Sequence, residues 1–313
     1  MDFSHHDLIP LVKHHRPDLN GQISLRPVPT GKFNTSFFVD ADGEGMILRI
    51  APPDQSVFCF YERDMMRQEP GLHSLLREQT SVPVPRIIAY DNSRELIDRD
   101  FLLMERLPGR PLTETARVNQ ADVLRQVGKL LAETHALTAE TYGYIGEHRP
   151  MEPRPCWREA FRTMWHKLID DVESVGHYNG EESGYMRGLL EGRLSLFDRD
   201  VPSRLLHMDV WAQNILVDGS GKVTGLIDWD RALWGDREIE FAVLDYCGIS
   251  EPPFWEGYGE QRDTSREARV RQGFYLLYEL QKYIVIREGR GNDTASARRY
   301  KSQVMQLARG SLG

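Results

Sequence analysis

Apolar and polar residues alternate along the first third of the chain, in short runs separated by turn residues. Runs of this kind occupy residues 23–28, 36–39, 46–50, 86–90 and 101–104. A period of two predicts strands, and the short links between the first three runs favour an antiparallel meander. We therefore expect an N-terminal lobe with a five-stranded antiparallel sheet and few helices.

Beyond residue 112 the apolar positions recur every three or four residues, which is the period of an amphipathic helix. Glu105 to Pro111 (ERLPGRP) interrupts regular structure between the two patterns. We place a lobe boundary near Leu107, giving residues 1–106 and a larger, mainly helical lobe of residues 107–313. The predicted fold class is α+β and bilobal. The predicted helices are 4–15, 123–135, 157–175, 186–197, 237–246, 265–289 and 294–309.

A hairpin is predicted where two β-prone runs, Ile215–Val217 and Val223–Ile227, flank the turn residues DGSGK. Folding the chain about Ser220 places Asn214 opposite Leu226. Asp228 then lies diagonally across on the same face, about 7–8 Å away. An amide oxygen and a carboxylate suit a hard cation such as Mg²⁺ shared with substrate phosphates.

Asp209 precedes this hairpin on a predicted loop, where it could accept a proton from a nucleophile. Arg49 alternates with Leu48 and Ile50, so it projects from the opposite face of its strand. Arginine can bind phosphate oxygens with two parallel hydrogen bonds. The stretch around the hairpin is therefore typical of phosphoryl transfer.

Composition narrows the setting of this chemistry. The chain has 313 residues, a net charge of −8 and three cysteines without a CxxC pair, so we expect a reducing, cytoplasmic compartment. No run is long enough to span a bilayer, and no signal peptide is recognisable.

Residues 262–313 carry a net +6, but no basic patch interleaved with aromatics accompanies them, so we expect no nucleic-acid or membrane partner. Four histidines near the N-terminus, His5, His6, His14 and His15, are accompanied by no cysteine and no cage of acidic residues, and we interpret them as exposed helix or tail residues and not as metal ligands.

The spacing His207-x-Asp209-x-x-x-x-Asn214, followed by Asp228 in IDWD, resembles the aminoglycoside phosphotransferase and choline kinase superfamily. The LLMERLPGRPL hinge, LAETHAL and a GD…E…A segment extend the resemblance over roughly residues 21–248. It implies a protein-kinase-like fold, Asp209 as the catalytic aspartate, and Asn214 with Asp228 as Mg²⁺ ligands.

The same resemblance gives supporting roles to three further residues. His207 would brace the catalytic loop, Asp230 would support the metal site, and Asp236 would brace the loop from the start of its helix. Met208 stands where protein kinases have the arginine of their HRD motif, and no APE-type segment is present. A protein substrate is therefore not expected.

The nucleotide site is also implied by the resemblance. Arg49 would bind phosphates where many relatives have lysine, paired with Glu69, or with Glu62 if the helix starts late. Glu105 and Leu107 would contact the purine through backbone groups. The loop TGKFNTS, with Asn34, would cover the nucleotide without a GxGxxG motif.

The predicted function is transfer of the γ-phosphate of ATP or GTP, with Mg²⁺, to a hydroxyl of a small molecule. The alternatives are a nucleotide-binding pseudokinase without transfer activity and a hydrolytic metal site. The acceptor stays open between an aminoglycoside, a macrolide, a choline-like amine and a sugar, and the oligomeric state is not predicted. Candidate acceptor contacts, each of which could equally be a packing or surface residue, are Trp157, Trp165, Tyr246, Trp255, Tyr258, Asp245, Glu251 and Glu256.

Overall fold

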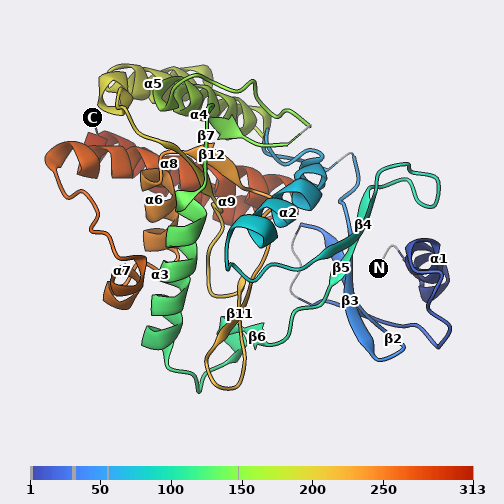
Figure 1. Ribbon diagram of the computed structural model, residues 1–313. Helices are drawn as coiled ribbons and strands as arrows, with labels where there is room; N and C mark the ends of the chain where they lie inside the picture. Colours follow the sequence, from blue (N-terminus) through green and yellow to red (C-terminus); the bar gives the residue numbers. More distant parts are fainter. Residues whose placement is uncertain (1–2, 30–32, 55, 147, 313) are drawn as a thin grey trace.

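The computed structural model describes residues 3–29, 33–54, 56–146 and 148–312. A strand-rich part with one flanking helix stands beside a larger part that is mostly helical (Figure 1). The predicted α+β architecture is therefore confirmed. Within the described residues, no helix is both long and apolar enough to cross a bilayer.

The strand-rich part is one antiparallel sheet in the order β1-β2-β3-β5-β4. Its strands are β1 (Ser24–Pro27), β2 (Thr35–Ala41), β3 (Glu44–Ile50), β4 (Ile87–Asp91) and β5 (Phe101–Glu105). All five predicted strands are present. The tight β2–β3 turn uses Asp42 and Gly43, both with positive φ, as a two-residue hairpin turn requires.

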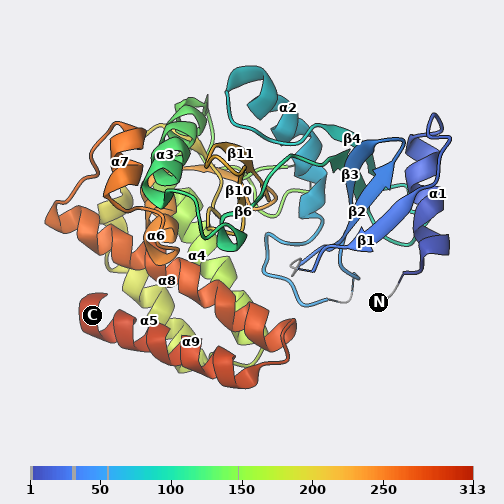
Figure 2. The same cartoon turned by 90° about the horizontal axis from the view of Figure 1, so that it is seen from below.

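Helix α1 (His5–His15) covers one face of this sheet (Figure 2). Its buried side chains pack in one cluster with Leu48 and Ile50 of β3. Arg49 lies between these two on the strand, so it points away from α1 and toward the helical part. The period-two pattern of β3 thus places the arginine on the predicted face.

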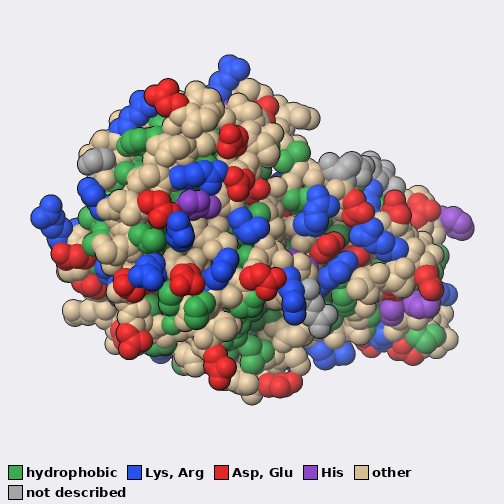
Figure 3. Space-filling view, turned by 90° about the horizontal axis from the view of Figure 1, so that it is seen from above, with side chains coloured by type: hydrophobic (Ala, Val, Ile, Leu, Met, Phe, Trp, Pro, Cys, Tyr) green, Lys and Arg blue, Asp and Glu red, His purple; other side chains and the backbone are tan. Residues whose placement is uncertain are grey.

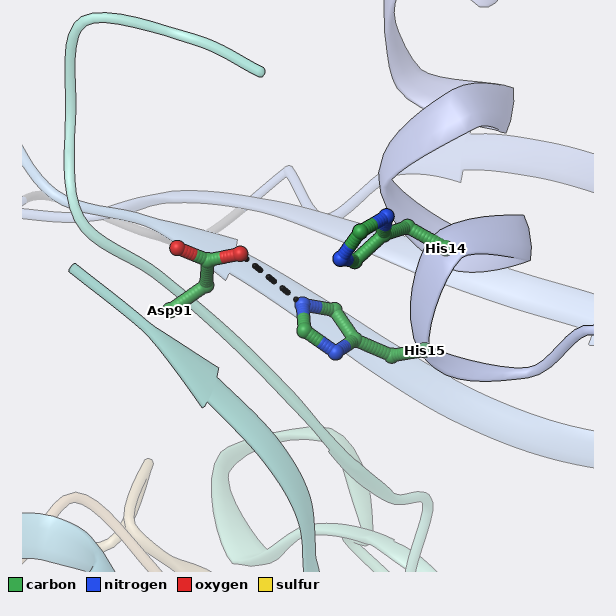
Figure 4. Close-up of side chains that lie close together, drawn as sticks. All are labelled: His14, His15 and Asp91. Atoms are coloured by element: carbon green, nitrogen blue, oxygen red, sulfur yellow. Dashed lines mark hydrogen bonds and ion pairs between the residues drawn. The ribbon is translucent and has the colours of Figure 1, made fainter. Parts of the chain in front are cut away.

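The C-terminal end of α1 meets the end of β4 (Figure 4). His15 Nε2 lies 3.0 Å from Asp91 Oδ2, and the ring of His14 stands edge-on to that of His15 at 4.8 Å. This pair fastens α1 to the sheet. Asp91 is far from the histidines in sequence, so the expectation that no acidic group accompanies them is wrong for His14 and His15.

Helix α2 (Glu69–Gln79) follows a 3₁₀ turn at Met65–Gln68 and has Pro70 in its first turn. Proline in a first helical turn loses no hydrogen bond, because the N–H groups there have no partner within the helix. Glu69 is therefore at the start of a helix.

The helical part has two cores, and helix α6 contributes buried residues to both. One joins α4, α5, α8 and α9, and the other joins α3, α6, α7 and the predicted hairpin. The helices are α3 (Gln120–Ala136), α4 (Trp157–Ser174), α5 (Gly180–Glu191), α6 (Glu238–Tyr246), α7 (Pro252–Tyr258), α8 (Arg266–Gly289) and α9 (Thr294–Leu307). The predicted helix at 186–197 instead ends at Glu191 and is followed by a 3₁₀ turn at Leu194–Phe197, and α7 was not predicted.

Short strands, most of them not predicted, shape the region between the helices. A three-stranded sheet has the order β11-β10-β6 and a four-stranded sheet the order β7-β9-β12-β8. Their bounds are β6 (Arg110–Pro111), β7 (Thr138–Ala139), β8 (Gly143–Tyr144), β9 (Ser203–Leu206), β10 (Ile215–Val217), β11 (Val223–Leu226) and β12 (Leu233–Gly235).

The hairpin β10–β11 forms, but its predicted register is wrong by one residue. Near the turn Val217 pairs with Val223, as folding about Ser220 requires. Thr224 is then an extra residue in a β-bulge, so Leu226 faces Ile215 and not Asn214. The prediction paired residues at equal distances from Ser220. Such a count cannot include an extra residue on one strand, because a bulge forms only when the strands pair.

Charged side chains of both signs are interspersed over the face of the molecule in Figure 3. The net +6 of residues 262–313 does not translate into a single basic patch on that face. Many of these cations pair with acids, as Arg271 does with Glu238 at 2.7 Å.

Candidate active site

The loop at His207–Asp209 is held by a buried carboxylate on α6. Glu240 Oε1 accepts the backbone N–H groups of His207 at 3.1 Å and Met208 at 2.7 Å. Its other oxygen lies 2.6 Å from His135 Nε2. Burial alone would raise the pKa of Glu240, but these donors outweigh it and lower the pKa. Glu240 therefore anchors the loop as an ionised carboxylate.

His207 braces the loop from within. Its Nδ1 accepts the backbone N–H of Asp209 at 3.2 Å, which leaves Nε2–H to donate to Ile227 O at 3.0 Å. Its ring lies 4.2 Å from that of Trp229. Both ring nitrogens are engaged, so the geometry offers no free nitrogen on His207 for a general base.

Asp209 is half-buried and has one oxygen fixed by the hairpin. Asn214 Nδ2 donates to Asp209 Oδ2 at 3.0 Å and to its backbone oxygen at 2.9 Å. Because the amide nitrogen of Asn214 faces Asp209, its oxygen is turned elsewhere and is available to a cation. One side chain can thus orient the aspartate and serve as a metal ligand.

Arg49 joins the sheet to the helical part through three carboxylates. Its Nη1 lies 2.6 Å from Glu69 Oε2, while Nη2 lies 3.0 Å from Asp228 Oδ1 and 3.1 Å from Asp230 Oδ2. The fallback partner Glu62 instead lies 3.0 Å from Arg290. Glu69 is therefore the acid that pairs with Arg49. We call Arg49, Glu69, Asp228 and Asp230 the bridging cluster.

Negative charge exceeds positive charge in the bridging cluster. Burial is the largest effect on Glu69 and raises its pKa to about 7, although Arg49 opposes the shift. Burial, followed by the neighbouring charge of Asp228, raises the pKa of Asp230. An additional cation close by would stabilise the ionised form of these carboxyl groups.

Asp228 is the accessible member, with a side chain 40% exposed. Its backbone is left-handed, at φ 70°. It follows the end of β11, so its direction comes from this special conformation and not from strand alternation. Its carboxylate and the oxygen of Asn214 are hard ligands of the kind that Mg²⁺ prefers, and the surplus negative charge fits a divalent cation.

Parts of the predicted nucleotide site lie outside the described residues, namely Thr30, Gly31 and Lys32 of the TGKFNTS loop. Asn34 is buried, with Nδ2 3.5 Å from Asp230 Oδ2 and no hydrogen-bond partner for its Oδ1 among the described residues. At the hinge, the backbone N–H of Glu105 already donates to Arg86 O at 3.0 Å. A purine contact from Glu105 would therefore use its carbonyl oxygen.

Asp236 has contacts other than those expected of it. Its carboxylate lies 2.9 Å from Arg199 Nη1 and accepts the N–H of Glu238 at 3.1 Å. Burial raises its pKa. Glu240, four residues later in the GD…E…A segment, holds the catalytic loop instead. The prediction gave Asp236 the role of bracing the loop, and in the structure the loop at His207–Asp209 is held by Glu240 of the same motif.

The candidate acceptor residues divide by burial. Trp157 and Trp165 are in the core, and Tyr258 is buried against His135. Tyr246, in contrast, is 38% exposed, and its ring lies 5.7 Å from that of Tyr283. The other candidates make local contacts, because Trp255 bonds to Ser250, Asp245 pairs with Arg262, Glu256 pairs with Arg125, and Glu251 precedes α7.

A buried arginine paired with a helix glutamate, an aspartate oriented by an asparagine, and a nearby exposed carboxylate lie between a sheet and a helical part. This arrangement is typical of small-molecule kinases with a protein-kinase-like fold. The model of the Phosphotransferase enzyme family matches residues 24–273, and the chain belongs to this family. It is an ATP-dependent phosphotransferase, and both the predicted class and the predicted fold are confirmed.

Relatives of several kinds share the chain's sequence or fold. It is 26% identical to the "Probable ketoamine kinase YniA" of Escherichia coli (strain K12) over 270 residues, which is 83% of this chain and 86% of the relative. A fructosamine-3-kinase candidate from Haemophilus somnus has a TM-score of 0.69 at 18% identity, with 95% and 96% of the two chains covered. A thermostable aminoglycoside phosphotransferase APH(4)-Ia has a TM-score of 0.68 at 18% identity, with 98% and 100% covered. At these identities the solved structures establish the fold alone.

Proposed function

We propose that this protein transfers the γ-phosphate of Mg²⁺-bound ATP to a hydroxyl of a small sugar-containing amine of the ketoamine type. The observation that carries the transfer chemistry is Asp209, whose carboxylate is oriented by Asn214 on a loop anchored by Glu240. Such a carboxylate can accept the proton of an acceptor hydroxyl as it attacks phosphorus.

In this proposal residues 1–106 are the nucleotide-binding lobe and residues 107–313 carry the catalytic and acceptor-binding groups. Asn214 and Asp228 would hold Mg²⁺, which neutralises charge on the phosphates when bound. Arg49 would bind phosphate oxygens, and Asn34 would lie close to them. The carbonyl of Glu105 and the backbone of Leu107 would contact the purine.

The acceptor class is supported by the relatives named ketoamine kinases. Asp209 also lies 3.7 Å from the ammonium of Lys282. A cation in this place does not favour an acceptor with several positive charges near the reacting hydroxyl. The pseudokinase alternative rested on Arg49 in place of lysine. Arg49 nonetheless makes an ion pair with Glu69, so nothing favours that alternative.

The test is transfer of labelled phosphate from ATP and Mg²⁺ to a panel containing a fructosamine, a free sugar, choline, a macrolide and an aminoglycoside. We expect phosphate on the fructosamine, with ATP preferred over GTP in competition. Transfer to the aminoglycoside alone would contradict the acceptor class, and nucleotide binding without transfer to any compound would contradict the kinase. Asp209→Asn is the matched inactive control.

A further inference from the structure

A chain of buried ion pairs runs from helix α8 to the catalytic loop. Lys282 Nζ lies 2.5 Å from Glu279 Oε1 and 3.7 Å from Asp209 Oδ1. Glu279 Oε2 accepts Arg231 Nη1 at 2.8 Å, and the same nitrogen donates to Met208 O at 2.7 Å. We call Asp209, Lys282, Glu279 and Arg231 the inner cluster.

The inner cluster is costly to bury. Side chains of Lys282 and Glu279 are 5% and 1% exposed, whereas that of Asp209 is 29% exposed. Buried ion pairs are weak evidence for stability, because apolar side chains of similar size often stabilise a core equally well. The only member within reach of a substrate is Asp209, so the chain of charges ends at the reacting group.

Two side chains constrain the carboxylate of Asp209 from different elements. Asn214 of the hairpin donates to Oδ2 at 3.0 Å, while Lys282 of α8 faces Oδ1 at 3.7 Å. The ammonium is itself fixed by Glu279 and lies 4.8 Å from the centroid of the Tyr283 ring. A carboxylate held at both oxygens cannot rotate freely, and fixed orientation accounts for much of the catalysis in phosphoryl transfer.

We propose that Lys282 is a positioning residue, which holds Asp209 in the orientation needed to receive the acceptor's proton. This role rests on the proposed function, because it acts through the proposed base. Among the described residues, Lys282 forms ion pairs with Asp209 and Glu279 and none with the bridging cluster around Arg49. Its effect should therefore fall on turnover and leave nucleotide binding unchanged.

The test is Lys282→Met, which removes the charge and keeps an unbranched stem. We expect kcat to fall about 10- to 100-fold and KM for ATP to change less than about threefold, because only orientation at the acceptor side is lost. The matched control is Lys301→Met, since Lys301 of α9 pairs with Glu182 at 2.8 Å and touches no site residue. Its kcat should equal that of the wild type.

A double-mutant comparison separates positioning from general stability. In an Asp209→Asn background, Lys282→Met should reduce single-turnover transfer no further, because both changes affect one unit. A kcat within about threefold of the wild type, or equal losses in kcat and nucleotide affinity, would overturn the proposal. If Lys282→Met does not fold, Lys282→Gln removes the charge and keeps a polar side chain, and a kcat within about threefold of the wild type would overturn the proposal likewise. Wild-type transfer tests the proposed function by itself, so the two failures are distinguishable.

Discussion

The two ion-pair clusters beside the catalytic loop differ in charge balance. The bridging cluster sets one cation, Arg49, against the three carboxyl groups of Glu69, Asp228 and Asp230, so carboxyl groups outnumber cations by two. The inner cluster sets Lys282 and Arg231 against Glu279 and Asp209, so it is neutral. Only the first therefore has a use for an added divalent cation.

The two clusters also differ in the parts of the molecule that they connect and in their exposure to solvent. The bridging cluster joins β3 and α2 to the segment after β11, and its outer member Asp228 is 40% exposed. The inner cluster lies wholly within the helical part, and all its members except Asp209 are nearly closed to solvent. We infer that the bridging cluster, with its surplus of acids and its exposed member, is suited to bind a ligand. The inner cluster, with balanced charges and buried members, is suited to hold a reacting group in place.

The largest expected effect comes from the one residue of the inner cluster that would contact substrate. Asp209→Asn removes the proton acceptor but keeps the side-chain volume, and kcat should fall on the order of 10²- to 10⁴-fold. Affinity for ATP with Mg²⁺, measured by calorimetry, should stay close to that of the wild type. Retained turnover would show that Asp209 is not the base.

Breaking the bridging cluster at its centre should cost stability as well as binding. Arg49→Met leaves buried carboxylates without their cation, and unfolding should become easier by about 3–5 kcal/mol. Arg49→Lys keeps a charge but cannot reach Glu69 and both aspartates at once, so its loss should be smaller. Urea unfolding of the two variants measures this, and equal stabilities would show that the arginine's two-sided contacts do not matter.

The outer member of the bridging cluster should affect the nucleotide more than the fold. Asp228→Asn removes one negative ligand at an exposed position, so the Mg²⁺-dependent part of ATP affinity should fall at least about 10-fold. Thermal stability without nucleotide should change little. A variant with unaltered Mg²⁺ dependence would contradict the assignment of Asp228 as a metal ligand.

The smallest expected effect is a pH dependence of folding stability that comes from His73, which lies next to Glu69. Burial lowers the pKa of His73 to about 4, its Nε2 lies 3.8 Å from Glu69 Oε2, and its Nδ1 lies 2.9 Å from Pro85 O. The folded histidine stays neutral while the unfolded one takes up a proton below its ordinary pKa near 6.5. Stability contributed by His73 should therefore fall by about 1–2 kcal/mol between about pH 7 and pH 5.

Glu69 acts in the opposite direction in the same range, because its raised pKa lets the fold bind a proton as the pH falls. The contribution of His73 is thus isolated only by comparison with His73→Asn, whose amide can still donate to Pro85 O. Urea unfolding at both pH values should show a smaller loss on acidification in the variant. Identical pH dependences would contradict a neutral buried His73.

Local pattern was sufficient for the strands of the sheet, most helices, and the proposed roles of Asp209, Asn214 and Asp228. These residues lie within one short stretch, so spacing and turn chemistry alone bring them together. The period of β3 fixed only the face on which Arg49 lies. Its pairing with Glu69 was predicted from the family resemblance, with Glu62 as the alternative, and the structure has the Glu69 pair.

The contacts that distant segments make with the candidate site depend on the tertiary structure. Glu240 reaches the catalytic loop from α6 and Lys282 reaches it from α8, and neither position has a local signal that distinguishes it from other charged helix residues. The bulge at Thr224 and the left-handed backbone of Asp228 likewise arise from strand pairing and packing. A period reveals which face of an element is buried, but the partner that face meets is set only when the elements pack against one another.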